Sequence, residues 1–205
     1  MNNRRELYRR VEEFRQAFHV GKGPVDVFAI CEQIPGLELR QVVLKTHGFN
    51  GVYMRGESRD LILLNAARTR KEQMFDLSHE LMHWWLHREK ASHGRRDALK
   101  EWQANEGAAE LLVPWKELAQ RVYACRGALS SAENLRRFTT AQAQRCGVTE
   151  AVIRFRYESL RAELALARAG VKPSSLEVPG RWGISLNTLE AEQTGDRMLC
   201  AVSRR

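Results

Sequence analysis

Three of the six histidines in this 205-residue chain lie at intervals of four residues in one short segment, FDLSHELMHWWLH. Within it, His79, Glu80 and His83 form the pattern HExxH. Side chains four residues apart lie on one face of a helix. Both imidazoles can therefore bind one ion at the zinc–nitrogen distance of about 2.0–2.1 Å. Glu80 can act as a general base on a water molecule at that ion. The alternative is a core-packed helix on which the histidines have no function.

A catalytic zinc ion needs a third protein ligand. His87 is excluded, because eight residues of helix place it about 12 Å from His79. In the segment EWQANEGAAELLVP, Glu101 can face the histidine pair if the two helices pack together. Asn105 lies one turn further and can accept a hydrogen bond from the far ring nitrogen of a liganding histidine. Glu101 could instead be a solvated acid at its helix N-terminus. Two further glutamates compete for the ligand position, Glu106 and Glu110.

The composition is that of an ordinary globular protein, with 43% hydrophobic and 28% charged residues. The first residues, MNNRRELYRRVEEFRQAF, carry charge throughout, so neither a signal peptide nor a membrane anchor is expected there. No apolar run is long enough to span a bilayer, so a cytoplasmic protein is expected. The cysteines form no CxxC pair and are predicted to be reduced thiols: Cys31, Cys125, Cys146 and Cys200.

The net charge of +8 allows contact with nucleic acid or an acidic partner. The basic residues are spread along the chain and form no long Lys/Arg block. A basic surface without a binding function explains this charge equally well.

A small sheet and a set of helices must position the candidate site. Apolar positions three and four residues apart predict a helix over 4–19, and Pro24 and Asp26 predict the start of a short helix over 25–33. The links between the next apolar segments are too short for helical crossovers, so a mostly antiparallel sheet is expected. Its three strands are predicted over 37–44, 51–54 and 61–65.

Helices dominate the chain from the histidine segment to Gly170. They are predicted over 68–87, 98–113, 114–126, 130–145 and 148–170, from apolar periodicity, caps and glycine stops. Residues 171–205 contain two prolines, three glycines and little periodicity. We therefore expect a single domain over 1–170, with its helical C-terminal part at about 115–170, and a loop-rich tail over 171–205.

Other side chains near the motif have plainer interpretations. Asp76 and Arg70 of the histidine helix are predicted to be solvated surface charges. Four tryptophans could frame a substrate groove, but packing in the core or between helices is the preferred interpretation. They are Trp84, Trp85, Trp102 and Trp115.

Together the two motifs resemble those of the ImmA/IrrE-type metallopeptidases. Residues 75–83 resemble the family pattern F-x-x-A-H-E-x-x-H, with Ser78 as the small residue, and residues 101–114 resemble E-x-x-A-N-x-F-A-A-x-L-L-M-P, with Val113 in place of the methionine. Gly107 replaces a phenylalanine of the second pattern, and Met82 replaces a common glycine of the first, so packing and partner fit are affected but no ligand is. The resemblance covers roughly residues 20–165, including GPVDVFAICEQIPGLEL, GFNGVYM, LILLN and CGVTEAVIRFRYESL.

This resemblance implies a zincin-like α+β fold, with a small sheet packed on a helical bundle that carries the HExxH helix. It implies one zinc ion held by His79, His83 and Glu101, with Glu80 as the catalytic base. Such proteins commonly accompany helix-turn-helix repressors of mobile elements or stress responses and relieve repression by cleaving them. The expected partner is therefore a protein substrate of that class.

The sequence thus predicts a zinc endopeptidase that hydrolyses a peptide bond. Tyr53 and His47 are candidates for stabilising the oxyanion. One alternative is a non-proteolytic zinc-containing module that binds a regulatory partner, and another is a toxin paired with a helix-turn-helix antitoxin. No direct DNA binding and no membrane contact are expected, and a monomer is preferred, although the sequence leaves the oligomeric state open.

Overall fold

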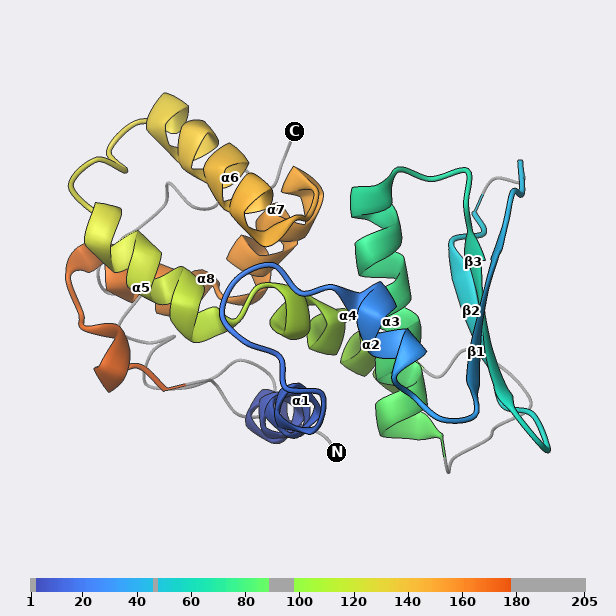
Figure 1. Ribbon diagram of the computed structural model, residues 1–205. Helices are drawn as coiled ribbons and strands as arrows, with labels where there is room; N and C mark the ends of the chain where they lie inside the picture. Colours follow the sequence, from blue (N-terminus) through green and yellow to red (C-terminus); the bar gives the residue numbers. More distant parts are fainter. Residues whose placement is uncertain (1–2, 46–47, 89–97, 178–205) are drawn as a thin grey trace. The chain divides into compact units, whose positions relative to one another are not determined.

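The computed structural model describes residues 3–45, 48–88 and 98–177 (Figure 1). These residues form two compact units. One contains residues 10–112 and 146–148, and the other contains the described residues before 10, from 113 to 145 and from 149 onward. The predicted division into a domain over 1–170 and a tail stays a prediction, because most of the tail lies outside the described residues.

The sheet has three strands, β1 (Leu37–Val42), β2 (Gly51–Met54) and β3 (Asp60–Asn65). Their order is β1-β3-β2, and β3 pairs parallel with β1 and antiparallel with β2. The α+β fold class is confirmed, but the sheet is mixed rather than mostly antiparallel. The prediction assumed that strands adjacent in sequence pair with each other. Here β2 returns the chain, so the parallel pair needs no helical crossover.

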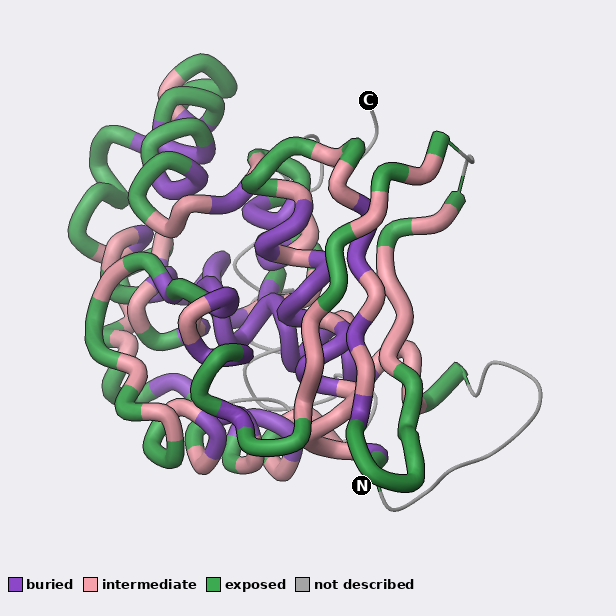
Figure 2. Tube along the Cα trace, turned by 45° about the vertical axis from the view of Figure 1, so that its right-hand side comes forward, coloured by how far each residue is buried: buried purple, intermediate pink, exposed green. Residues whose placement is uncertain are grey.

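Helices α2 (Val27–Glu32) and α3 (Arg70–His87) pack against this sheet, α2 on β1 and α3 on β2 and β3. Along β3, buried residues alternate with half-buried ones until the strand end, as a strand covered mainly on one face requires (Figure 2). Helix α2 begins at Asp26, whose carboxylate accepts hydrogen bonds from the backbone N–H groups of Phe28 and Ala29. The sheet thus forms a support for α3.

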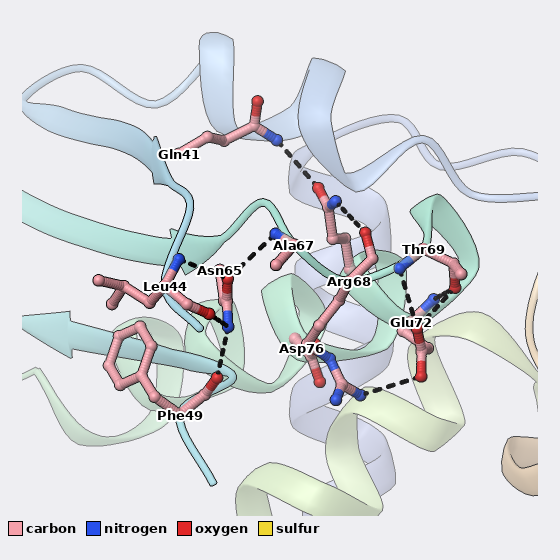
Figure 3. A network of polar contacts seen from close by, with 10 residues as sticks. Gln41, Leu44, Phe49, Asn65, Ala67, Arg68, Thr69, Glu72 and Asp76 are labelled. Carbon is pink, nitrogen blue, oxygen red and sulfur yellow. Dashed lines mark hydrogen bonds and ion pairs between the residues drawn. The ribbon is translucent and has the colours of Figure 1, made fainter. Parts of the chain in front are cut away.

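Polar groups fix the start of α3 (Figure 3). Thr69 and Glu72 form a capping box, in which each side chain accepts a hydrogen bond from the other residue's backbone N–H. Arg68 reaches over this turn to Asp76, with 2.6 Å between Nε and Oδ2. The prediction that Asp76 is a solvated surface charge is wrong, because its face of the helix is covered and its side chain is only 6% exposed. Arg70, in contrast, is exposed and lies over the Phe28 ring.

Two tryptophans anchor α3 to its surroundings. The Trp85 indole N–H donates to the backbone oxygen of Arg10 in α1 (Arg4–Ala17), and its ring packs edge-on against buried Phe14. The Trp84 indole N–H donates to the Asp60 carboxylate at the start of β3. These contacts agree with the packing interpretation.

None of the described helices is long and apolar enough to cross a membrane.

The other unit consists mainly of helices. They are α5 (Trp115–Cys125), α6 (Ala132–Cys146), α7 (Glu150–Ser159), α8 (Arg161–Ala169) and the short 3-10 helix η1 (Pro173–Ser175). The predicted single helix over 148–170 is divided in two. At the division, buried Leu160 has φ −111° and ψ 22°, outside the helical range. Gly170 ends α8 with a positive φ of 103°, as predicted.

A buried arginine organises the polar contacts of this unit. Arg156 of α7 has no exposed surface. Its Nε donates to the backbone oxygen of Val113 at 3.1 Å, and one terminal nitrogen donates to the Tyr8 hydroxyl at 2.8 Å. Hydrogen bonds of this kind are needed to bury a guanidinium group without a large desolvation penalty.

Candidate active site

Three potential ligands converge where α3 meets α4 (Ala98–Leu112). The Nε2 atoms of His79 and His83 are 3.0 Å apart. The two carboxylate oxygens of Glu101 lie 3.6 Å from His79 Nε2 and 3.7 Å from His83 Nε2. Ligand atoms at the corners of a tetrahedral zinc site are about 3.3 Å apart when the bonds are about 2.05 Å long. The observed spacings bracket this value, so the three side chains fit a small divalent ion.

The three potential ligands differ in how far their side chains are exposed. The side chains of His79 and His83 are 16% and 17% exposed, whereas that of Glu101 is 38% exposed. Burial, assisted by the neighbouring histidines, lowers the pKa of His83 to about 3, and a neutral imidazole is the form that binds metals. The competing Glu106 and Glu110 are buried and are not in the group of potential ligands found among the described residues.

The far nitrogen of His79 has the partner that the sequence predicts. His79 Nδ1 lies 3.0 Å from Oδ1 of Asn105 in α4. An amide oxygen can only accept, so Nδ1 carries the proton and Nε2 keeps a free lone pair. Asn105 thus orients the His79 ring with Nε2 toward His83 and Glu101.

The far nitrogen of His83 contacts a histidine that the sequence interpretation treated only as a rejected ligand. His83 Nδ1 lies 3.1 Å from His87 Nδ1, and His87 Nε2 lies 2.7 Å from Oε1 of Gln103 in α4. The sequence contained an indication of the contact between His83 and His87, because these residues have the same spacing of four as His79 and His83. No spacing in the sequence indicates the contact with Gln103.

Glu80, the predicted base, is 8% exposed and is held by the sheet. Its Oε2 accepts a hydrogen bond of 2.7 Å from the backbone N–H of Tyr53 in β2. Burial raises the pKa of Glu80 to about 7. The Tyr53 N–H opposes this shift, and the carboxylates of Glu101 and Asp76 add to it. A carboxylate with such a pKa is suited to accept and release a proton near neutrality.

The approach of β2 to Glu80 leaves little room for a side chain at the start of the strand. A Cβ atom on Gly51 would lie 3.2 Å from Glu80 Cγ and 3.3 Å from the backbone oxygen of Leu63. Both distances are shorter than ordinary van der Waals contacts. The glycine is visible in the segment GFNGVYM, but its role depends on contact between the strand and α3, which the sequence does not show.

Of the two oxyanion candidates, only Tyr53 lies in the described part of the chain, and it is not in the ligand group. Burial and the nearby Asp60 carboxylate raise the pKa of Tyr53 to about 12, so its phenol stays protonated. Its hydroxyl is buried near Asp60, a carboxylate that accepts a hydrogen bond from the Trp84 indole and forms an ion pair with Arg88. His47 lies outside the described residues. An oxyanion role for either residue therefore stays a prediction.

Comparison with known families places the same segments in one domain. The model of the IrrE N-terminal-like domain, peptidase family M78, matches residues 37–158. This match covers more than half of the chain and contains every site residue described above. No curated protein matches the sequence.

Proposed function

The chain belongs to the ImmA/IrrE family of metallo-endopeptidases, and on this premise we propose that it uses one zinc ion to cleave a helix-turn-helix transcriptional repressor. The observation that carries the metal assignment is the spacing of His79, His83 and Glu101, whose donor atoms lie within 4.8 Å of one another. Two imidazoles and one carboxylate are the ligand set of many zinc peptidases, whereas structural zinc sites are usually closed by four protein ligands.

Different residues of the chain have different roles in the proposed hydrolysis of a peptide bond. A zinc ion bound by the three ligands would supply Lewis-acid activation and lower the pKa of water toward neutrality. Glu80 accepts the proton of the attacking water at its carboxylate and then delivers it to the amine that leaves. The Tyr53 N–H and the closeness of Gly51 hold that carboxylate in place. Asn105 orients His79.

The proposed substrate class rests on the family relationship. A peptidase acts on a protein, and members of this family commonly accompany helix-turn-helix repressors of mobile elements or stress responses. Cleavage of such a repressor relieves repression without any DNA contact by the peptidase. We therefore propose a helix-turn-helix transcriptional repressor as the first class of substrate to test.

Replacing Glu80 by glutamine tests the proposal, since the amide keeps the size of the side chain but cannot take a proton. We expect repressor cleavage, followed by electrophoresis and mass spectrometry, to fall by at least about 10²-fold, with zinc content unchanged. Glu57→Gln, at an exposed position of the β2–β3 connection, is the matched control and should cleave like the wild type.

Full cleavage by Glu80→Gln would contradict the catalytic assignment. If the wild type binds zinc and forms a stable complex with the repressor without cutting it, the chain acts as a partner-binding module instead. Growth arrest on expression that the neighbouring gene relieves would indicate the toxin alternative.

A further inference from the structure

A row of hydrogen bonds leads from His83 away from the ligand group and into the protein. It passes from His83 Nδ1 to His87 Nδ1 over 3.1 Å, and from His87 Nε2 to Gln103 Oε1 over 2.7 Å. His87 is 9% exposed and Gln103 is 4% exposed, so water does not compete freely for these contacts. The row crosses from α3 to α4, the two helices that supply the ligands.

Donor and acceptor chemistry fixes the direction of this row. The Gln103 oxygen can only accept, so His87 Nε2 carries a proton. A neutral His87 then has a bare Nδ1, which accepts from Nδ1–H of His83. His83 with its proton on Nδ1 has a bare Nε2, and that nitrogen lies 3.0 Å from His79 Nε2 and 3.7 Å from Glu101. The lone pair available to a metal is therefore the one that faces the other two ligands.

We propose that His87 and Gln103 are positioning residues that hold His83 in its Nδ1-protonated tautomer, with Nε2 directed at the metal. This inference rests on the metal site of the proposed function. Asn105 acts on His79 through one direct hydrogen bond of 3.0 Å, and His87 with Gln103 acts on His83 through two successive bonds. Groups that orient liganding histidines in this way commonly change metal affinity by roughly 10- to 100-fold.

The opposite direction of the row is incompatible with metal binding by His83. If Gln103 donated its amide N–H to His87 Nε2, His87 would carry its proton on Nδ1 and donate it to His83 Nδ1. His83 would then carry its own proton on Nε2, which blocks the nitrogen that faces Glu101. Metal binding and the orientation of the buried Gln103 amide are thus coupled.

A matched pair of substitutions at His87 separates this role from packing. In His87→Asn, the side-chain oxygen occupies the place of Nδ1 and can still accept from His83. Leucine has the same number of side-chain heavy atoms as asparagine, so His87→Leu matches His87→Asn in size but offers no acceptor. We expect His87→Leu to raise the zinc Kd by roughly 10- to 100-fold and His87→Asn to stay close to the wild type, in competition titrations with a chromophoric chelator.

Equal losses in the two variants, or wild-type affinity in both, would overturn the proposal and leave His87 as a packing residue. Thermal melts of the metal-free proteins show whether His87→Leu folds. If it does not, Gln103→Met serves as the second variant, since it keeps the length of the side chain and leaves His87 in place. Its zinc Kd is also expected to rise, and an unchanged Kd would overturn the proposal.

The zinc-loaded wild type gives a direct readout that needs no substitution. Long-range ¹H–¹⁵N correlation spectra of the imidazoles should show protons on Nδ1 of His83 and on Nε2 of His87. A proton on Nδ1 of His87 would overturn the proposal, whatever a peptidase assay shows. Conversely, the expected tautomers and affinities without repressor cleavage would contradict the proposed function alone, whereas a wild type that binds no zinc would contradict both.

Discussion

At the scale of single residues, the position of Glu80 depends on a residue 29 positions earlier in the chain. The Gly51→Ala change would place a Cβ 3.2 Å from Glu80 Cγ and 3.3 Å from the Leu63 oxygen. Because Glu80 must then move, we expect peptidase activity to fall by about 10- to 100-fold. Overpacking should also lower the free energy of unfolding by about 1–3 kcal/mol. Zinc affinity should not change, because the ligands are not displaced.

Gly21→Ala is the control for this substitution, because a Cβ at Gly21 meets no atom within 4 Å. Cleavage assays and urea denaturation of the two variants together separate the local effect from a general cost of replacing glycine. Undiminished activity in Gly51→Ala would show that contact with β2 does not set the position of Glu80.

At this scale the sequence predicts the three potential ligands and one group that orients them, Asn105, but not the other contacts around them. Helical spacing alone places His79 and His83 on one face, and the second motif supplies Glu101 and Asn105. The contact between His87 and Gln103 could not be predicted, because it depends on how two helices cross and on side-chain rotamers. The hydrogen bond from the Tyr53 backbone could not be predicted either, since every residue type except proline has a backbone N–H and the sequence does not show where it points.

At the scale of elements, the first turns of α3 are held by charge pairing on a covered face. Arg68 is the cation that faces buried Asp76, and burial raises the pKa of Asp76 even though Arg68 lowers it. In Arg68→Ala, the Asp76 carboxylate keeps its burial and loses this partner. We expect the free energy of unfolding at neutral pH to fall by about 1.5–3 kcal/mol, the usual range for a hydrogen bond to a charged group.

The pH dependence of this loss has a definite sign. Without Arg68, the folded-state pKa of Asp76 moves further above its unfolded value, so the fold disfavours the charged form. The penalty is present above the raised pKa and disappears as Asp76 gains a proton at lower pH. Urea denaturation should therefore show the gap between Arg68→Ala and the wild type narrowing as the pH falls. Lys71→Ala, at an exposed position of the same helix, is the control and should show no such trend. A gap that is constant with pH would contradict this account.

Element boundaries were predicted well where local residues such as a glycine end a helix. They were predicted less well where packing between elements sets the boundary or the pairing. Gly170 and the apolar pattern placed the end of α8 and the strand β2, because both depend on short-range preferences. The parallel pairing of β1 with β3 was missed, since strand order is a property of the whole sheet. The division at Leu160 was also missed, because an amphipathic pattern continues through it.

At the scale of the whole molecule, the fold class followed from the sequence and the internal division did not. Three short strands among helices indicate an α+β protein. The two compact units each combine segments distant in sequence, such as 10–112 with 146–148. Contacts of that kind cannot be read from composition or periodicity. The family match over 37–158 takes in residues of both units.

The metal content of the purified protein, measured by elemental mass spectrometry, tests the central claim most directly. We expect about one zinc ion per chain in the wild type, none in His79→Ala and a weakly held ion in Glu101→Ala, because each loses one of the three ligands. Glu57→Ala, which alters an exposed carboxylate, should retain zinc like the wild type. A wild type that contains no zinc after gentle purification, and takes up none on titration, would contradict the account.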